Sequence, residues 1–297
     1  MRRHRLSALI VALLAVVALA AGCAGRAAEA TDAAADAAEI IENKGSDTLV
    51  NLALAWAEAY MAANPTARIS VTGGGTGTGI AAMINGTVDI ANASRAMKDE
   101  EIAAAQANGI NPVEHVVAGD AIAIVVHPSN PVDGLTLQQL SDIYTGQLTN
   151  WQQVGGEDRP IVLLSRESNS GTYVYFLEEV IRRGEESDLL FSPDTLLMPS
   201  SEGISVEVRQ NPNAIGYDGL GYVTDDQKVL GVAAADGEPF VLPSAETVND
   251  GSYPIARELF MYTAGEPQGV VQSYMAYIFT EGQAIVATLG FVPLETK

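Results

Sequence analysis

Short apolar runs rich in valine and isoleucine alternate along the chain with segments whose apolar residues recur at helical spacing. The apolar runs predict strands at residues 69–71, 88–90, 113–117, 121–126 and 161–164, several of them buried on both faces. The helical spacing predicts helices at 49–60, 99–108 and 173–181, and a capping box at 136–139 opens a further helix that Gly146 closes. This alternation predicts an α/β fold with largely parallel sheets.

The length of the chain suggests more than one compact unit. It has 297 residues, and at ~150 residues per domain this suggests about two domains. We expect two α/β lobes, with a crossing between them at residues 119–131 and a return near 253–263. Lobe 1 would then comprise residues 39–118 and 253–297, and lobe 2 residues 119–252.

The first residues differ in kind from the rest. Arg2, Arg3 and Arg5 precede an apolar run at residues 6–21 that ends in small residues, so residues 1–22 are predicted to be a secretory signal peptide. The run has roughly 16 residues, fewer than the ~20 that a membrane-spanning helix needs.

The single cysteine, Cys23, directly follows two alanines and Gly22. This arrangement resembles a bacterial lipobox, which implies acylation of Cys23 and attachment to a membrane surface outside the cytoplasm. The alternative is an ordinary signal peptide followed by a chance free thiol. Residues 23–38 are rich in alanine, aspartate, glutamate and threonine, and they predict a flexible tether.

The charge balance argues against nucleic-acid binding, and the cysteine count excludes two kinds of cysteine site. Lysine and arginine total 16 against 37 aspartates and glutamates, a net charge of −21. Nucleic-acid binding needs clustered basic surface, so it is not expected. One cysteine allows neither an internal disulfide nor a cysteine zinc cluster.

Small, hydroxyl-rich loops stand where predicted strands give way to helices. They are Gly45-Ser46-Asp47-Thr48, the glycine-rich run at 73–79 with Thr76, the pair Ser94-Arg95, and the run from Arg166 through Ser170 and Gly171 to Thr172. Helix N-termini offer unpaired N–H groups, glycines permit close approach, and arginines grip oxyanions with two donors. Because open α/β sheets bind ligands at this edge, the loops together predict an anion site.

Each loop taken alone has a structural explanation. Ser46 suits a plain N-cap, the glycine run a flexible turn, and Arg95 a solvated charge. Arg166 could form a surface ion pair with Glu167. Asp47 could be a carboxylate that the helix dipole favours at a helix start.

Two standard phosphate-binding signatures are absent from the sequence. It contains neither a P-loop of the G-x-x-x-x-G-K-[ST] type nor a G-x-G-x-x-G run, so nucleotide binding has no support. A secreted hydrolase using Ser170 or Thr76 remains an alternative, but such nucleophiles need a base, and only His115 and His127 follow the signal peptide. No G-x-S-x-G elbow occurs.

These loops, in this order, resemble the phosphate-binding proteins that serve as solute-binding subunits of phosphate ABC transporters. The resemblance spans roughly residues 40–293 and includes the Ile-Tyr-Thr-Gly run at 143–146 and the Ala-Ile-Gly-Tyr run at 214–217. It implies a type II periplasmic-binding-protein fold, a monomer that captures phosphate between its lobes, delivery to an ABC permease, and neither catalysis, cofactor nor metal. The resemblance assigns Asp47, Thr48, Thr76, Arg166, Ser170, Gly171 and Thr172 to phosphate, and the loops add Ser46, Ser94 and Arg95 as further expected phosphate-binding residues.

One position departs from the family pattern. Well-known members carry an aspartate where Arg95 stands, and its carboxylate accepts the proton that phosphate carries and sulfate lacks. Asp47 is our first candidate for a replacement acceptor and Glu167 a weaker one. The departure keeps receptors for sulfate, molybdate, tungstate or a phosphonate open as alternatives. An extracytoplasmic sensor of the same fold is a further alternative, and a purely structural surface protein would not need three convergent anion loops.

Overall fold

The computed structural model describes residues 40–295. The predicted signal peptide, the tether and Cys23 lie outside these residues. The strands are β1 (Ile40–Gly45), β2 (Arg68–Thr72), β3 (Ile90–Ala93), β4 (Val113–Val126), β5 (Gly134–Thr136), β6 (Val162–Arg166), β7 (Leu196–Met198), β8 (Ala214–Gly219), β9 (Lys228–Ala233) and β10 (Ala256–Thr263). The α-helices are α2 (Asp47–Ala63), α3 (Thr76–Ile84), α4 (Asp99–Ala107), α5 (Leu137–Tyr144), α6 (Gly171–Tyr175), α7 (Ser201–Gln210), α8 (Ala245–Asn249), α9 (Gly269–Phe279) and α10 (Gln283–Thr288). Short 3₁₀ turns form η1 (Trp151–Val154) and η3 (Leu220–Tyr222), and η2 (Phe176–Ile181) is a π-helical segment.

The strands follow the order β2-β1-β3-β10-β4-β8-β6-β7, and β9 pairs with β4 and β5. β1 pairs in parallel with β2 and β3, and β6 in parallel with β7 and β8. The antiparallel pairs among these described strands all include β4 or β10. The prediction of largely parallel sheets therefore holds on either side of two long strands that run in opposite directions.

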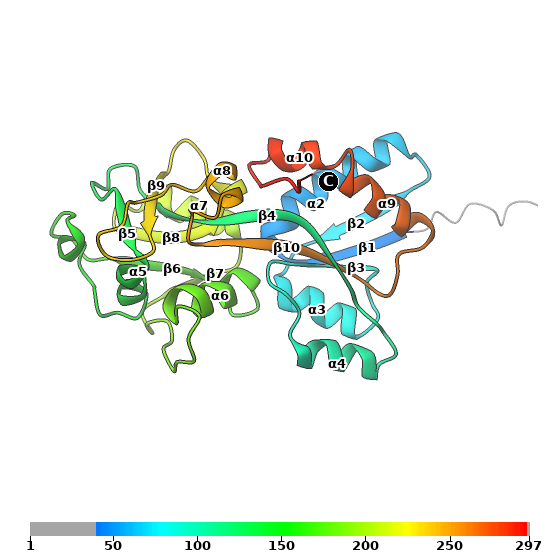
Figure 1. Ribbon diagram of the computed structural model, residues 1–297, viewed down its shortest axis with the longest axis horizontal. Coiled ribbons are helices and arrows are strands. Elements are labelled where there is room, and N and C mark those ends of the chain that lie inside the picture. The colour runs from blue at the N-terminus through cyan, green and yellow to red at the C-terminus, as the bar shows by residue number, and fades with distance from the viewer. Residues whose placement is uncertain (1–39, 296–297) are drawn as a thin grey trace, which may run out of the picture. The chain divides into compact units, whose positions relative to one another are not determined.

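β4 and β10 lie side by side and connect the two groups of parallel strands (Figure 1). The runs at 113–117 and 121–126, predicted as separate strands, are one continuous strand of 14 residues. Gly119 and Asp120 do not break it, because both are paired with β10, opposite Glu258 and Arg257. The polar residue Asp120 is therefore a buried residue inside the strand and does not mark the end of one.

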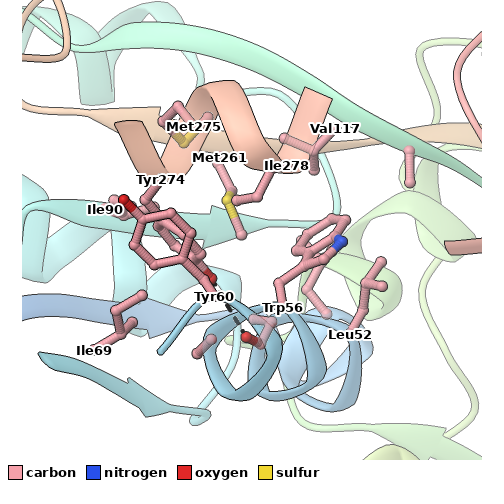
Figure 2. Packing of buried hydrophobic residues seen from close by; sticks show 14 of the residues in the cluster. Leu52, Trp56, Tyr60, Ile69, Ile90, Val117, Met261, Tyr274, Met275 and Ile278 are labelled. Atoms are coloured by element: carbon pink, nitrogen blue, oxygen red, sulfur yellow. Dashed lines mark hydrogen bonds between the residues drawn. The ribbon is translucent and has the colours of Figure 1, made fainter. Parts of the chain in front are cut away.

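Lobe 1 is the part of the chain that packs around β1, β2 and β3. Residues of α2, α9 and α10 form one apolar cluster with these strands, and residues of α3 and α4 form a second. Figure 2 shows the first cluster, in which Trp56 and Tyr60 of α2 lie against Tyr274 and Ile278 of α9. The Trp56 Nε1–H donates to the Gly282 carbonyl at 2.8 Å. These contacts fix α2, whose first turn carries the first of the predicted anion loops.

Lobe 2 is the part that packs around β6, β8 and β9. Residues of α5, η1 and η2 form its larger apolar cluster, and residues of α7 form a smaller one. Along β4 the core changes from lobe 1 to lobe 2 between Ala118 and Ala121. The lobe boundaries given above remain a prediction.

Most predicted elements are present, with shifted ends. The capping box of α5 is confirmed: the Gln139 N–H donates to the Thr136 Oγ1 at 3.2 Å, and the Thr136 N–H donates to the Gln139 Oε1 at 2.9 Å. The strand predicted at 88–90 was wrong in position, since β3 begins at Ile90 and ends at Ala93. The buried residues after Ile90 are alanines and an asparagine, which lack the large apolar side chains on which the prediction relied. Within the described range no helix is both long and apolar enough to cross a membrane.

Candidate functional site

Two threonine hydroxyls from different lobes meet where the lobes join. Thr48 lies in the first turn of α2 and Thr172 in the first turn of α6, and both are buried. Their Oγ1 atoms are 2.9 Å apart, within hydrogen-bonding distance. Each helix follows a serine, a residue favoured before a helix start, so each threonine stands where backbone N–H groups lack intrahelical partners.

A second hydroxyl pair joins the ends of two lobe 1 elements. The Thr76 Oγ1 in the first turn of α3 accepts the Ser94 N–H at 3.0 Å and lies 3.2 Å from the Ser94 Oγ. Gly171 of lobe 2 packs directly on this pair. A Cβ on Gly171 would collide with the Thr76 hydroxyl and lie 2.6 Å from the Ser94 Oγ. Glycine is therefore required for the two lobes to approach this closely.

Arg166 at the end of β6 is buried and forms an ion pair across the lobes. Its Nη2 donates to the Asp47 Oδ2 at 2.9 Å, and its Nη1 donates to the Ser201 Oγ at 2.9 Å. The Nε is buried and lacks a hydrogen-bond partner among the residues described. The alternative of a surface pair between Arg166 and Glu167 is wrong, because Glu167 is exposed and Arg166 pairs with Asp47.

The glycine-rich run receives a loop of lobe 2. The Gly77 N–H donates to the Asn169 carbonyl at 2.9 Å, and the Asn169 Nδ2 donates to the Gly74 carbonyl at 2.9 Å. Gly75 has a φ of +89°, and a Cβ there would lie 2.9 Å from the Asn169 carbonyl oxygen. The glycines thus admit a close approach, as predicted, but the group that approaches them is the backbone of the opposite lobe.

A buried ion pair on the two crossing strands contacts these hydroxyls, and no local pattern in the sequence predicts it. The Arg257 Nη2 on β10 donates to the Asp120 Oδ2 on β4 at 2.8 Å, and its Nε donates to the same oxygen at 3.1 Å. The same Nη2 donates to the Thr172 Oγ1 at 3.0 Å. Burial raises the pKa of the Asp120 carboxyl, and Arg257 opposes that rise.

A second fully buried carboxylate, Asp218, feels the charge of Arg166. Asp218 on β8 is fully buried, and its Oδ1 accepts its neighbour's N–H, from Gly219, at 2.9 Å. Burial raises the pKa of the Asp218 carboxyl to about 7, while the charge of Arg166 opposes the rise. A protonated Asp218 leaves the Arg166 charge balanced by Asp47 alone among these groups.

The structure brings most of the predicted site residues together. Thr48, Thr76, Ser94, Gly171 and Thr172 form one contiguous group of hydroxyls and backbone. Ser46 and Ser170 are buried and stand immediately before the helices α2 and α6. The Ser170 Oγ accepts the Thr172 N–H at 3.2 Å, so this serine caps the helix that carries Thr172.

The predicted contribution of Arg95 is not supported by the position of its side chain. Its Nη1 and Nη2 donate to the two carboxylate oxygens of Glu101 at 2.8 and 2.7 Å, and its Nη1 also donates to the Ala96 carbonyl. Glu101 lies in the first turn of α4, six positions along the chain, and so offers a local partner. The alternative of a solvated charge is wrong, because the pair is largely buried, and a role of Arg95 in phosphate binding stays a prediction.

The comparisons with known proteins give the family of this chain. Residues 30–281 match the sequence model of the PBP superfamily domain. The chain belongs to this family. It is 34% identical over 275 residues to the phosphate-binding protein PstS of Pseudomonas aeruginosa strain PAO1, covering 86% of this chain and 84% of that protein. It is 32% identical over 252 residues to PstS of Bacillus subtilis strain 168, covering 84% and 79%.

Solved structures of the family show the same two-lobed fold. A Clostridium perfringens protein, assigned as a phosphate ABC transporter substrate-binding protein and crystallised with bound phosphate, superposes with a TM-score of 0.78. It is 34% identical and covers 86% of this chain and 100% of its own. The expected family and the type II periplasmic-binding-protein fold are therefore confirmed.

Proposed function

We propose that this protein captures inorganic phosphate and delivers it to an ABC permease. Phosphate would bind at the hydroxyl cluster, which consists of the side chains of Thr48, Thr76, Ser94 and Thr172. The observation that carries the proposal is the 2.9 Å contact between Thr48 and Thr172, because it places donors of both lobes at one point. The phosphate-bound relative and the PstS proteins described above support the choice of ligand.

The donors suit a small tetrahedral anion. The hydroxyls of Thr48 and Thr76 come from the first turns of α2 and α3 in one lobe, and the Thr172 hydroxyl comes from the first turn of α6 in the other. Hydrogen bonds to a charged group contribute roughly 1.5–3 kcal/mol each. A handful would offset the desolvation of phosphate and leave ~8 kcal/mol, which corresponds to about micromolar affinity.

Asp47 is the proposed acceptor for the proton of phosphate. Its Oδ1 accepts the Gly74 N–H at 3.0 Å and its Oδ2 accepts from Arg166 at 2.9 Å. Each carboxylate oxygen has a second lone-pair site, so one further donor can be accommodated. Glu167, the weaker candidate, is exposed to solvent and is not favoured.

The positions of the histidines favour binding over hydrolysis. The His115 Nε2 lies 2.9 Å from the Thr263 Oγ1, and the His127 Nδ1 lies 2.8 Å from the Ser129 Oγ. Both rings are thus bonded to hydroxyls other than those of Ser170 and Thr76. We therefore assign the protein a binding role and no turnover.

We infer that the protein lies outside the cytoplasm and is held at the membrane by acyl chains on Cys23. The basic and apolar segment before Cys23 supports this location. Cys23→Ser tests it, because the variant should move from the membrane fraction to the soluble fraction while phosphate affinity stays unchanged. Retention of the variant in the membrane fraction would contradict the anchor.

The proposed ligand is tested by calorimetric titration of the protein stripped of bound anions. Phosphate should bind with micromolar or tighter affinity and do so equally in excess sulfate, and Arg166→Ala should abolish the heat. No heat with phosphate but heat with sulfate or molybdate would overturn the choice of ligand and leave the site standing.

A further inference from the structure

One arginine side chain touches three of the segments that carry the hydroxyls. From β10, the Arg257 Nη2 donates to the Thr172 Oγ1 at 3.0 Å and to the Thr48 Oγ1 at 3.4 Å. Its Nη1 donates to the Ser94 carbonyl at 3.0 Å. Two of these segments belong to lobe 1 and one to lobe 2, so the guanidinium lies where the lobes converge.

The guanidinium is fixed from several sides. Asp120 accepts from its Nε and Nη2, and the other Asp120 oxygen accepts the Leu220 N–H at 3.1 Å. The ring of Tyr175 lies 5.6 Å from the guanidinium carbon, within the range of cation–π attraction. The Arg257 and Asp120 side chains are 3% and 0% exposed. A buried pair with this many partners holds one orientation.

The direction of these hydrogen bonds determines what the threonines can do. A guanidinium only donates, so the Thr172 Oγ1 accepts from the Arg257 Nη2 at 3.0 Å and the Thr48 Oγ1, at 3.4 Å, shares a hydrogen of the same Nη2. Thr48 and Thr172 share one hydrogen bond, which uses one of their two hydroxyl hydrogens. The remaining hydroxyl hydrogen is left to donate to a third group, and an anion is the group that such a donor suits.

We propose that Arg257, held by Asp120, is a positioning residue of the phosphate site that orients the Thr48–Thr172 hydroxyl pair so that its remaining hydrogen donates to the ligand. This inference rests on the proposed function and adds residues that do not themselves bind the ligand. Because Asp120 balances its charge, Arg257 acts on affinity through the direction of hydrogen bonds rather than through net charge.

A double-mutant cycle tests the inference. Calorimetric phosphate affinities are measured for the full-length protein and for Arg257→Gln, Thr172→Val and the double variant. If Arg257 acts through the hydroxyl, each single change weakens binding about 10-fold or more, and the double variant is little weaker than the worse single variant. Multiplicative losses would overturn the inference, as would an unchanged affinity in Arg257→Gln.

A second pair of variants guards against misfolding, since Arg257→Gln leaves Asp120 buried without its partner. Arg257→Met combined with Asp120→Leu removes both charges, a change that buried ion pairs often tolerate. In that background Thr172→Val should cost at most about 2-fold in affinity. A loss as large as in the wild-type background would overturn the inference.

The control is Arg209→Gln, which removes a partly exposed arginine that pairs with Glu202 at 3.3 Å. It should leave the phosphate affinity unchanged. Absence of phosphate binding by the wild-type protein would refute the proposed function itself, and that result differs from every outcome of the cycle.

Discussion

The Arg166 guanidinium of lobe 2 donates to the Asp47 carboxylate of lobe 1 over 2.9 Å, although the two residues are 119 positions apart. The pair is buried on the arginine side and 15% exposed on the carboxylate side. It therefore joins the lobes next to the α2 loop. If Asp47 accepts the proton of phosphate as proposed, this contact also couples selectivity to the contact between the lobes.

Asp47→Asn should reduce discrimination between phosphate and sulfate. The amide would lose one carboxylate oxygen and its charge, so the proton of phosphate would lose its proposed acceptor. We expect the ratio of sulfate to phosphate dissociation constants, measured by calorimetry, to fall about 10-fold or more. Glu167→Gln, at an exposed carboxylate, should leave the ratio unchanged. An unaltered ratio in Asp47→Asn would assign the acceptor to another group.

Thr172→Val should weaken phosphate binding without unfolding the protein. Valine keeps the shape of the side chain but removes a hydroxyl that meets both Thr48 and Arg257. Loss of a hydrogen bond to a charged ligand predicts a rise of about 10–100-fold in the dissociation constant. The matched control is Thr288→Val, whose exposed hydroxyl donates to the Ala284 carbonyl in α10. Equal affinities for the two variants would remove Thr172 from the site.

Arg95→Gln should affect stability more than binding. The side chain is engaged by Glu101, so its loss should cost about 0.5–1 kcal/mol in the free energy of unfolding. Phosphate affinity should change less than about 3-fold, because the Arg95 guanidinium donates to Glu101 and Ala96 and to none of the clustered hydroxyls. Denaturant unfolding and calorimetry on the same variant separate the two effects. A large loss of phosphate affinity would show that Arg95 contributes to phosphate binding.

Asp218→Asn should alter the dependence of stability on pH. The folded protein keeps the Asp218 proton up to about pH 7, whereas the unfolded chain releases it near 3.8. Between these values the folded state binds more protons, so wild-type stability falls as the pH rises. The variant lacks this loss, and its melting temperature relative to wild type should increase from about pH 4.5 to about pH 8.

The control for this pH series is Asp225→Asn, which changes an exposed carboxylate. Its melting temperature should run parallel to that of the wild type over the whole range. A parallel curve for Asp218→Asn would mean that the buried carboxyl releases its proton at similar pH in the folded and unfolded states.

The sequence predicts much of the site because its signals are local. Thr48, Thr76 and Thr172 stand in short hydroxyl-rich loops at helix starts, and helix N-termini follow from nearby residues. Arg166 could be placed with them because it belongs to the same run as Thr172. The same local reasoning assigned Arg95 to the site. However, Glu101, in the acidic first turn of α4, is a nearby carboxylate that competes with phosphate for the Arg95 guanidinium.

The sequence does not predict residues whose partners are distant along the chain. Arg257 meets Thr48 across 209 positions and Asp120 across 137, and neither contact leaves a local pattern. A single arginine in a β-strand resembles an ordinary surface charge until the fold buries it. The one feature of the sequence that indicated a buried partner for Arg257 was Asp120, an acidic residue that precedes the apolar end of β4.

The most direct measurement is a crystal structure of the protein grown with phosphate. We expect a phosphate ion whose oxygens lie about 2.5–3.2 Å from the hydroxyls of Thr48, Thr76, Ser94 and Thr172, with Arg257 still bound to Asp120. A phosphate ion held elsewhere, or one coordinated by Arg95 in place of these hydroxyls, would contradict it.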